Sequence, residues 1–509
     1  MSPATLQTLK NLLFNVVTFG FNYGVSFFLT PYLIRHVGRE AYGFFPLVNS
    51  IIGYSSILTT AIGSMSGRFV TMAIYKDDIQ GANRYFNSVW VANAAFSALF
   101  TVIAVFLIVF VDSVISVPEG LLTEVRCLFG FGSFSLICGL LTGCLAMGTF
   151  VKNRLDMTAT RNIALSCTNV AIIVALFSLF RPSIVYMSAG VLVVAPLSFL
   201  FNLSFKRKLL PELTFAPWRF FSFSAVKEVF FSGIWNSLNQ LSSVLLQQVD
   251  LLITNIFIGA SATGSYALAK TAPSFIYGVL AMLSSSFSPR FNILYAQGKV
   301  QELVGEIKKS MRIVGFLVGI PVGLLLAYGR EFYALWVPGE DAGFLYRLTV
   351  VTVAPLMIGG SINPIFGVFS VTNKLRVPSL VVLGAGTANT LAIFVLLSTT
   401  NLGIWAIAIV GAVQGGLRNL LFTPSYGAAC LGRKWHTFYP VMIKGCLGMV
   451  VVALGGFAFK QVLPADSWLK LLLSGAVAAT AAAFVNLFFV FDRFERAALY
   501  SAIRGKFAR

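Results

Sequence analysis

Residues 86–111 read FNSVWVANAAFSALFTVIAVFLIVFV. The stretch contains no charged side chain. An α-helix rises about 1.5 Å per residue, so this run is long enough to cross the roughly 30 Å hydrocarbon core of a bilayer. Similar apolar runs recur from one end of the 509-residue chain to the other. The pattern predicts a protein whose whole chain is organised as membrane-spanning helices.

The composition of the chain leads to the same conclusion. Hydrophobic residues make up 57% of the chain and charged residues only 11%, against roughly 25% charged residues in soluble domains. We therefore expect an all-α polytopic membrane protein with about fourteen transmembrane helices. The expected spans are 11–34, 44–66, 86–111, 122–148, 162–180, 183–203, 229–258, 264–288, 313–335, 343–370, 378–399, 403–430, 438–463 and 469–491.

The distribution of basic residues predicts the orientation of these helices. The formal net charge is +19, and most Lys and Arg residues fall in the loops on the side that carries both termini. Because cytoplasmic loops are enriched in Lys and Arg, we expect both termini in the cytoplasm. A basic protein can also bind nucleic acid, but cations spread over the loops of a hydrophobic chain favour anionic phospholipid headgroups instead.

Short loop motifs repeat at a nearly constant offset, which indicates an internal duplication. Gly38, Tyr42 and Gly43 correspond to Gly259, Tyr266 and Gly264; Arg68-Phe69 corresponds to Arg290-Phe291; and Asn153-Arg154-Leu155 corresponds to Asn373-Lys374-Leu375. The longest expected cytoplasmic connection separates the two sets of matches. We predict two pseudo-symmetric six-helix lobes plus two C-terminal helices, divided as 1–205, a cytoplasmic linker 206–228, 229–432, and 433–509 with a cytoplasmic tail.

Charged residues at bilayer depth are costly, so they are the best candidates for a functional site. Asp250 and Lys270 fall at similar depth on two helices joined by a very short turn, and we expect them to be close. One interpretation is a neutralised pair that holds the helices together. The other is a site where substrate or a coupling ion, Na⁺ or H⁺, competes for one partner, with Asp250 as the ion or proton site.

Arg418 is the deepest expected cation and has no evident acidic partner in the sequence. A guanidinium cannot deprotonate in a protein and its donors match phosphate geometry, so it favours a bound anion or a wet cavity over lipid. Gln414, Asn22, Asn49 and Gln247 could line the same cavity, although such amides often only bond neighbouring helices. Pro321, Pro355, Pro364 and Gly359-Gly360 are expected to break two helices, as hinges or as ordinary kinks.

Several classes of function are disfavoured by what the sequence lacks. No G-x-x-x-x-G-K-[ST] phosphate loop occurs, and we expect no cofactor, metal site or disulfide from the six scattered cysteines. A membrane-embedded polymerase or glycosyltransferase normally needs a large outer loop to hold its acceptor, and none is expected here. A purely structural role would not explain why the costly charges of Lys270 and Arg418 lie at bilayer depth. The sequence favours a transporter over an enzyme.

The chain resembles the polysaccharide and O-antigen flippases of the multidrug/oligosaccharidyl-lipid/polysaccharide exporter superfamily, over nearly its whole length. The motifs that carry the resemblance are Pro31-x-x-Ile34-Arg35-x-x-Gly38-x-Glu40-x-Tyr42-Gly43, Asn153-Arg154-Leu155-Asp156, and Ser232-Gly233-x-Trp235 followed by Asp250, Gly259 and Tyr266. The resemblance implies two six-helix lobes that alternate in access within a bacterial cytoplasmic membrane.

The substrate that the resemblance implies is an undecaprenyl-diphosphate-linked oligosaccharide, such as an O-antigen, capsule or exopolysaccharide repeat unit, moved from the inner to the outer leaflet. Lys270 and Arg418 would bind its diphosphate, the sugar would occupy a wet cavity and the polyprenyl tail would stay in lipid. Contact with the polysaccharide polymerase machinery is a further expectation. Drug exporters coupled to Na⁺ or H⁺ belong to the same superfamily and are the second interpretation, since they favour cationic substrates and acidic pockets.

Overall fold

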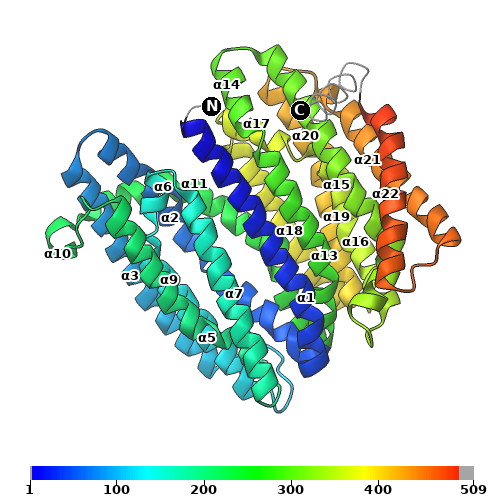
Figure 1. Ribbon diagram of the computed structural model, residues 1–509, viewed down its shortest axis with the longest axis horizontal. Coiled ribbons are helices and arrows are strands. Elements are labelled where there is room, and N and C mark those ends of the chain that lie inside the picture. Colours follow the sequence, from blue (N-terminus) through cyan, green and yellow to red (C-terminus); the bar gives the residue numbers. More distant parts are fainter. Residues whose placement is uncertain (1–2, 492–509) are drawn as a thin grey trace. The chain divides into compact units, whose positions relative to one another are not determined.

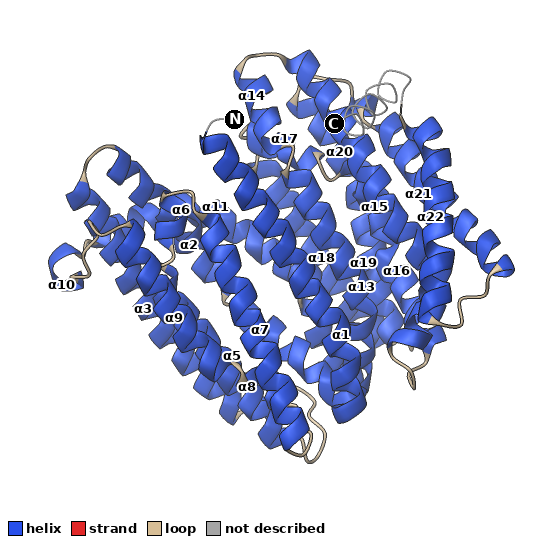
Figure 2. Cartoon of the chain, viewed as in Figure 1, coloured by secondary structure: helices blue, strands red, loops and turns tan. Residues whose placement is uncertain are grey.

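The computed structural model describes residues 3–491, so the predicted C-terminal tail beyond residue 491 lies outside the described part of the chain. The chain is 86% helical, and the described residues contain no strand (Figure 2). Fourteen helices among them are long and apolar enough to cross a membrane. The all-α, fourteen-helix prediction is confirmed.

Two compact units, Met1–Ser265 and Tyr266–Arg509, divide the chain. The helices of the N-terminal unit are, in order, α1 (Pro3–Gly53), α2 (Ser56–Tyr75), α3 (Ile79–Val109), α4 (Val111–Val114), α5 (Leu122–Gly143), α6 (Met147–Val151), α7 (Leu155–Leu179), α8 (Tyr186–Ala189), α9 (Val191–Leu209), α10 (Pro217–Phe220), α11 (Phe223–Gln247) and α12 (Val249–Ile258) (Figure 1). The unit boundary falls inside α13 (Ala260–Ser285).

Among the described residues, the C-terminal unit continues with further α-helices, a π-helix and a 3-10 turn. They are α14 (Ser288–Ala296), α15 (Val300–Trp336), α16 (Ala342–Ile362), α17 (Ile365–Val371), α18 (Arg376–Thr399), α19 (Ile404–Leu417), the π-helix Arg418–Phe422, α20 (Thr423–Cys430), the 3-10 turn Trp435–Thr437, α21 (Tyr439–Val462) and α22 (Trp468–Val490).

The compact units divide the chain later than the predicted lobe boundary does. The predicted division places 229–258 in the second lobe, whereas α11 and α12 lie in the N-terminal unit because α11 packs along α2. At the closest point Gly233 of α11 lies against Ala61 of α2, where an added Cβ would come within 1.9 Å of the Ala61 carbonyl oxygen. The division of the chain by sequence repeat stays a prediction.

The predicted linker 206–228 is anchored to α3 through buried side chains. The Oδ1 of Asn83 accepts a hydrogen bond from the Thr214 amide (2.7 Å), and the Oδ1 of Asn87 accepts one from the Ala216 amide (3.0 Å). The Oγ of Ser88 accepts a third from the Ser222 amide (2.9 Å). These bonds fix the linker backbone between α9 and α11.

The predicted break at Pro364 is a helix boundary, whereas Pro321, Pro355 and Gly359-Gly360 lie inside helices, so for these residues the kink interpretation stays a prediction. Pro364 follows the end of α16, and a separate helix, α17, begins at Ile365. Pro321 and Pro355 instead lie inside continuous helices, because long membrane helices tolerate a proline where neighbouring helices support the backbone. A break that we did not predict interrupts the expected span 44–66, since α1 ends at Gly53 and α2 starts at Ser56.

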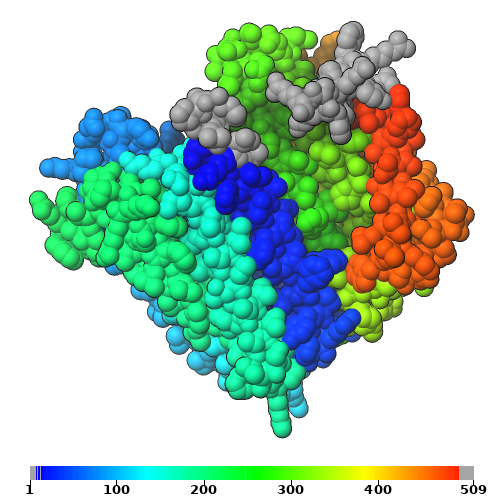
Figure 3. Space-filling view, in the orientation of Figure 1, coloured from blue at the N-terminus to red at the C-terminus, as the bar shows by residue number. Residues whose placement is uncertain are grey.

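The last two helices pack on α15 through small residues. Gly319 and Gly323 of α15 face α21, where a Cβ on Gly323 would meet the Cβ of Val452 at 2.5 Å. The buried hydroxyl groups of Tyr328 and Ser474 lie 2.6 Å apart and join α15 to α22. Figure 3 shows the orange and red surface of α21 and α22 along one edge of the C-terminal unit. These helices are an integral part of the unit.

Candidate functional site

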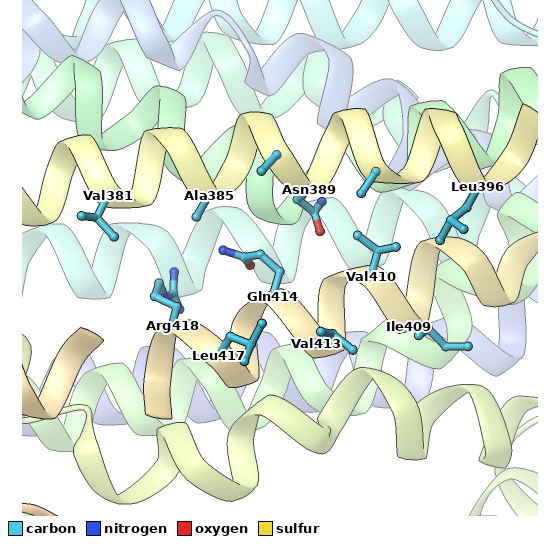
Figure 4. A pocket seen from close by; sticks show the side chains of 12 residues that line it. Val381, Ala385, Asn389, Leu396, Ile409, Val410, Val413, Gln414, Leu417 and Arg418 are labelled. Carbon is cyan, nitrogen blue, oxygen red and sulfur yellow. The ribbon is translucent and has the colours of Figure 1, made fainter. Parts of the chain in front are cut away.

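A groove of about 610 Å³ runs between α18 and α19 in the C-terminal unit. The α18 side is formed by Val381, Ala385, Ala388, Asn389, Ala392 and Leu396. The α19 side is formed by Ile409, Val410, Val413, Gln414, Leu417 and the adjoining Arg418. The two helices are antiparallel, so Arg418 and Val381 lie at one end of the groove and Ile409 and Leu396 at the other (Figure 4).

Three polar side chains share the groove with these apolar residues. Figure 4 shows Arg418, Gln414 and Asn389 directed into the space between the two helices. Within residues 3–491, no hydrogen-bond partner reaches Arg418 Nε, Gln414 Nε2 or Asn389 Oδ1, although all three atoms are buried. A buried polar atom without a partner costs about 1–3 kcal/mol. Three such atoms in one groove are therefore the strongest sign of a ligand site in the described chain.

The backbone at Arg418 is irregular. Arg418–Phe422 forms a π-helix between α19 and α20, a local widening that often marks functional sites. The Arg418 Nη2 donates to Asn419 Oδ1 (3.4 Å), and Asn419 Nδ2 donates to the Pro355 carbonyl (3.4 Å). Asn419 is 5% exposed. The π-helix is thus held against the proline-containing part of α16, which fixes the position of the guanidinium.

Arg418 lies far from both ends of the helical segment that contains it. It lies fourteen residues from Ile404, where α19 starts, and twelve residues from Cys430, where α20 ends. At 1.5 Å per residue these separations are roughly 21 and 18 Å, which places Arg418 near the middle of its span. Tyr277 of α13 is close enough to interact electrostatically with the guanidinium. No carboxylate among the described residues forms an ion pair with Arg418.

Asp250 belongs to the N-terminal unit and lies in the first turn of α12. It is 6% exposed and interacts electrostatically with Tyr54, whose hydroxyl donates to the Gln248 carbonyl (3.4 Å). A break in the helix at Gln248 gives Asp250 a helix N-terminus of its own, which stabilises a negative charge. The sequence did not indicate this break.

Lys270 belongs to the C-terminal unit and lies inside α13. Its ammonium nitrogen stands 5.3 Å from the centre of the Tyr266 ring, a cation–π contact. Lys270 is not among the described residues that line the groove beside Arg418. Because Asp250 and Lys270 fall in different units, their predicted pairing stays a prediction.

The remaining predicted residues are distributed over both units. Gln414 shares the groove with Arg418. Asn22 is exposed on α1, where its Oδ1 accepts a hydrogen bond from Ser166 of α7 (2.9 Å), and Asn49 is exposed further along α1. The Gln247 side chain lies outside the described part of the chain, although its backbone forms the last residue of α11.

Sequence reasoning missed Asn389, which is 2% exposed and faces the groove from α18. An uncharged amide in an apolar helix gives only a weak signal, because most such residues bond a neighbouring helix. The pairing of the expected span 378–399 with the antiparallel span 403–430 was predictable. Asn389 is the one amide residue within 378–399. Comparing polar residues across neighbouring helices would have found it.

The comparisons with known proteins identify a related membrane protein and solved structures with a similar fold. No family model matches the chain. It is 28% identical over 486 residues to the uncharacterized membrane protein EpsK of Bacillus subtilis (strain 168), covering 95% of both chains. Among solved structures it is similar to the lipid II flippase MurJ in an inward closed conformation, with a TM-score of 0.66 at 13% identity over 93% of this chain and 98% of that one.

A second solved structure has a different transport activity. It is the inward-facing conformation of a multidrug resistance MATE family transporter of the MOP superfamily, with a TM-score of 0.56 at 14% identity over 85% of this chain and 95% of that one. The chain has the MATE/MurJ fold. Two proteins with this fold thus have different activities, lipid II flipping and multidrug resistance, so the fold leaves the substrate open.

Proposed function

We propose that this protein is a flippase that moves an undecaprenyl-diphosphate-linked oligosaccharide from the inner to the outer leaflet of a bacterial cytoplasmic membrane. The proposal rests on one observation above all: the buried, unpartnered polar atoms of Arg418, Gln414 and Asn389 in a single groove. Both termini are cytoplasmic in this proposal, as the distribution of Lys and Arg favours.

The chemistry of the three side chains suits an anion carried by a lipid. Arg418 stays charged at any physiological pH, and its guanidinium presents several donors that match phosphate oxygens. Gln414 adds an amide donor, and the Asn389 amide can accept a hydrogen bond from a sugar hydroxyl or, when rotated, donate one to a phosphate. A bound diphosphate would supply the partners that these buried groups lack.

The similarity to the lipid II flippase supports translocation of a lipid-borne substrate, and both structural neighbours are transporters rather than enzymes. Lys270 is the second cation of the proposed binding site. In this proposal its ammonium group attracts the diphosphate toward α13. Before the substrate binds, the cation–π contact with Tyr266 holds the ammonium group in position. Alternating access of the two lobes would then expose the site to each leaflet in turn.

A cation-coupled multidrug exporter is the second candidate, and the burial of Asp250 favours it. A carboxylate that is 6% exposed at membrane depth is a natural proton or Na⁺ site. Such coupling is compatible with either substrate. Drug exporters of this kind favour cationic substrates, and the groove beside Arg418 has the opposite charge preference.

The test uses cells that lack the chromosomal gene and express Arg418→Gln, Lys270→Gln or the control Lys444→Gln at equal protein level. Lys444 is a suitable control because it lies five residues after Tyr439, where α21 begins, and has no role in the proposed site. We expect the first two variants to lose most surface polysaccharide and to accumulate lipid-linked oligosaccharide, with Lys444→Gln unchanged. Normal polysaccharide from both Arg418→Gln and Lys270→Gln would refute the cationic site. Unchanged lipid pools together with new sensitivity to cationic dyes would favour the exporter.

A further inference from the structure

We propose that the groove between α18 and α19 also binds the hydrocarbon chain of the substrate, with the chain lying along the helices and its anionic end at Arg418. This inference rests on the proposed function and deepens it. It departs from the expectation that the polyprenyl tail stays entirely in lipid, because it assigns the first part of the tail to the protein.

The shape of the groove suits an extended chain. Ala385, Ala388 and Ala392 recur at intervals of three and four residues, so they line one face of α18 and leave room where larger side chains would fill the space. Val410 and Val413 form the opposite wall on α19. The volume of about 610 Å³ is within the usual range of roughly 300–1,000 Å³ for small-molecule sites.

The polarity of the groove changes along its length. Arg418 lies at one end, Gln414 and Asn389 lie toward the middle, and the remaining stretch to Ile409 and Leu396 is apolar on both helices (Figure 4). The nine residues from Arg418 to Ile409 span roughly 14 Å. A soluble anion would fill only the polar end, and a neutral lipid chain would leave the buried Arg418 Nε without a partner.

The direction of the groove decides which way a bound chain would point. In the proposed topology, α18 starts on the cytoplasmic side and α19 starts on the outer side, so the apolar stretch runs from Arg418, near the middle of its span, toward the outer side. The occupant we assign is a single-chain anionic amphiphile, such as a prenyl phosphate, whose charged end lies near mid-membrane and whose chain points outward.

Binding of defined probes to the purified full-length protein in zwitterionic nanodiscs tests this assignment. Geranylgeranyl phosphate carries both the chain and the charge, geranylgeraniol carries the chain alone, and inorganic phosphate carries the charge alone. We expect geranylgeranyl phosphate to bind at least tenfold more tightly than either of the other two probes. Equal binding of inorganic phosphate would identify an anion site without a chain site, and equal binding of the alcohol would identify a groove filled by bulk lipid; either result overturns the inference.

Two variants separate the two ends of the groove. Ala388→Leu combined with Ala392→Leu fills the apolar stretch and leaves Arg418 in place, whereas Arg418→Gln removes the charge. We expect each to weaken geranylgeranyl phosphate binding at least tenfold, while the control Ala476→Leu on the exposed side of α22 has no effect. Retained tight binding by the Ala388→Leu/Ala392→Leu protein, with a folded protein confirmed by its unfolding temperature, would overturn the inference.

The outcome is distinguishable from failure of the proposed function. Suppose that Arg418→Gln abolishes surface polysaccharide but the Ala388→Leu/Ala392→Leu protein binds geranylgeranyl phosphate normally. The flippase proposal then stands, and the proposed binding of the hydrocarbon chain in the groove is wrong. Suppose instead that the Ala388→Leu/Ala392→Leu protein no longer binds geranylgeranyl phosphate, while no variant alters surface polysaccharide or the lipid-linked pools. The groove then binds an anionic lipid, and the flippase proposal is wrong.

Discussion

Gly43 and Gly264 pack directly against each other: a Cβ added to Gly43 would come within 2.7 Å of the Gly264 amide nitrogen. These two glycines hold corresponding positions in the predicted sequence repeat. Each follows another glycine with positive φ, Gly38 (82°) and Gly259 (113°). The duplication itself stays a prediction, and this contact is a position where corresponding residues of the predicted repeat meet.

Replacement of Gly264 by Ala should destabilise the protein, because the new Cβ would lie 2.4 Å from the Arg39 carbonyl oxygen and backbone atoms cannot rotate away. Overpacking of this kind costs about 1–3 kcal/mol, so the unfolding temperature in detergent should fall. The matched control is Gly24→Ala on α1, where nothing lies within 4 Å of an added Cβ. An equal unfolding temperature for the two variants would argue against a tight contact.

The repeat illustrates what the sequence can predict. Asn153 and Asn373 correspond in the sequence repeat, and both adopt left-handed backbone conformations, with φ of 52° and 54°. Each lies two residues after the end of a helix, α6 or α17. The backbone amide of the next residue donates to a carbonyl five residues earlier in the chain: Arg154 to Thr149 (2.7 Å) and Lys374 to Phe369 (2.9 Å). Turn residues carry strong local signals, so such correspondences can be recognised from the order of the amino acids alone.

Replacement of Asn87 by Ala should loosen the linker from α3. Asn87 is fully buried and makes two bonds to the linker, from its Nδ2 to the Thr214 carbonyl and to its Oδ1 from the Ala216 amide, both 3.0 Å long. Loss of both should cost about 2 kcal/mol. Limited proteolysis should then cut between residues 210 and 222 faster than in the wild type. Asn401→Ala, at an exposed turn, should leave the cleavage rate unchanged; slow cleavage in both variants would contradict the anchoring role.

Replacement of Asp156 by Asn should weaken the attachment of the α1 N-terminus to α7. Asp156 is 4% exposed, and it accepts hydrogen bonds from Arg154 Nε (3.0 Å) and Gln7 Nε2 (2.9 Å) and pairs with Lys10 Nζ (3.0 Å). We expect a loss of about 2 kcal/mol at low salt. Because Lys10 and Arg154 are partly exposed, the loss should shrink at 1 M salt, where the Debye length is about 3 Å. A salt-independent loss, measured by thermal unfolding, would contradict an ionic role.

Lys460 and Glu331 tie α21 to α15 through an ion pair of 2.9 Å, with both side chains about one quarter exposed. Lys460→Met should destabilise the protein by about 2 kcal/mol, since it leaves a largely buried carboxylate without its partner. The double variant Lys460→Met/Glu331→Leu should recover part of that loss, because no unpaired charge remains. A double variant less stable than Lys460→Met would show that Glu331 stabilises the protein even without Lys460, which would contradict the expected cost of the unpaired carboxylate.

The candidate site was only partly predictable. Arg418 was recognisable because a charge at bilayer depth contrasts with its apolar neighbours, and Gln414 followed from its position one helical turn before Arg418. Asn389 and the π-helix depend on packing between α16, α18 and α19, which no local pattern encodes. The same limit applies to Asp250, whose burial was expected but whose place at a new helix N-terminus depends on the break at Gln248.

The proposed role of Arg418 is tested most directly by the leaflet in which lipid-linked oligosaccharide is found. Intact cells expressing wild-type protein, Arg418→Gln or Lys444→Gln at equal levels would be labelled with a membrane-impermeant reagent that reacts with the saccharide. We expect labelling of the lipid-linked pool to fall at least tenfold in Arg418→Gln while the total pool rises, with Lys444→Gln at the wild-type level. Wild-type labelling in Arg418→Gln would contradict the proposed role.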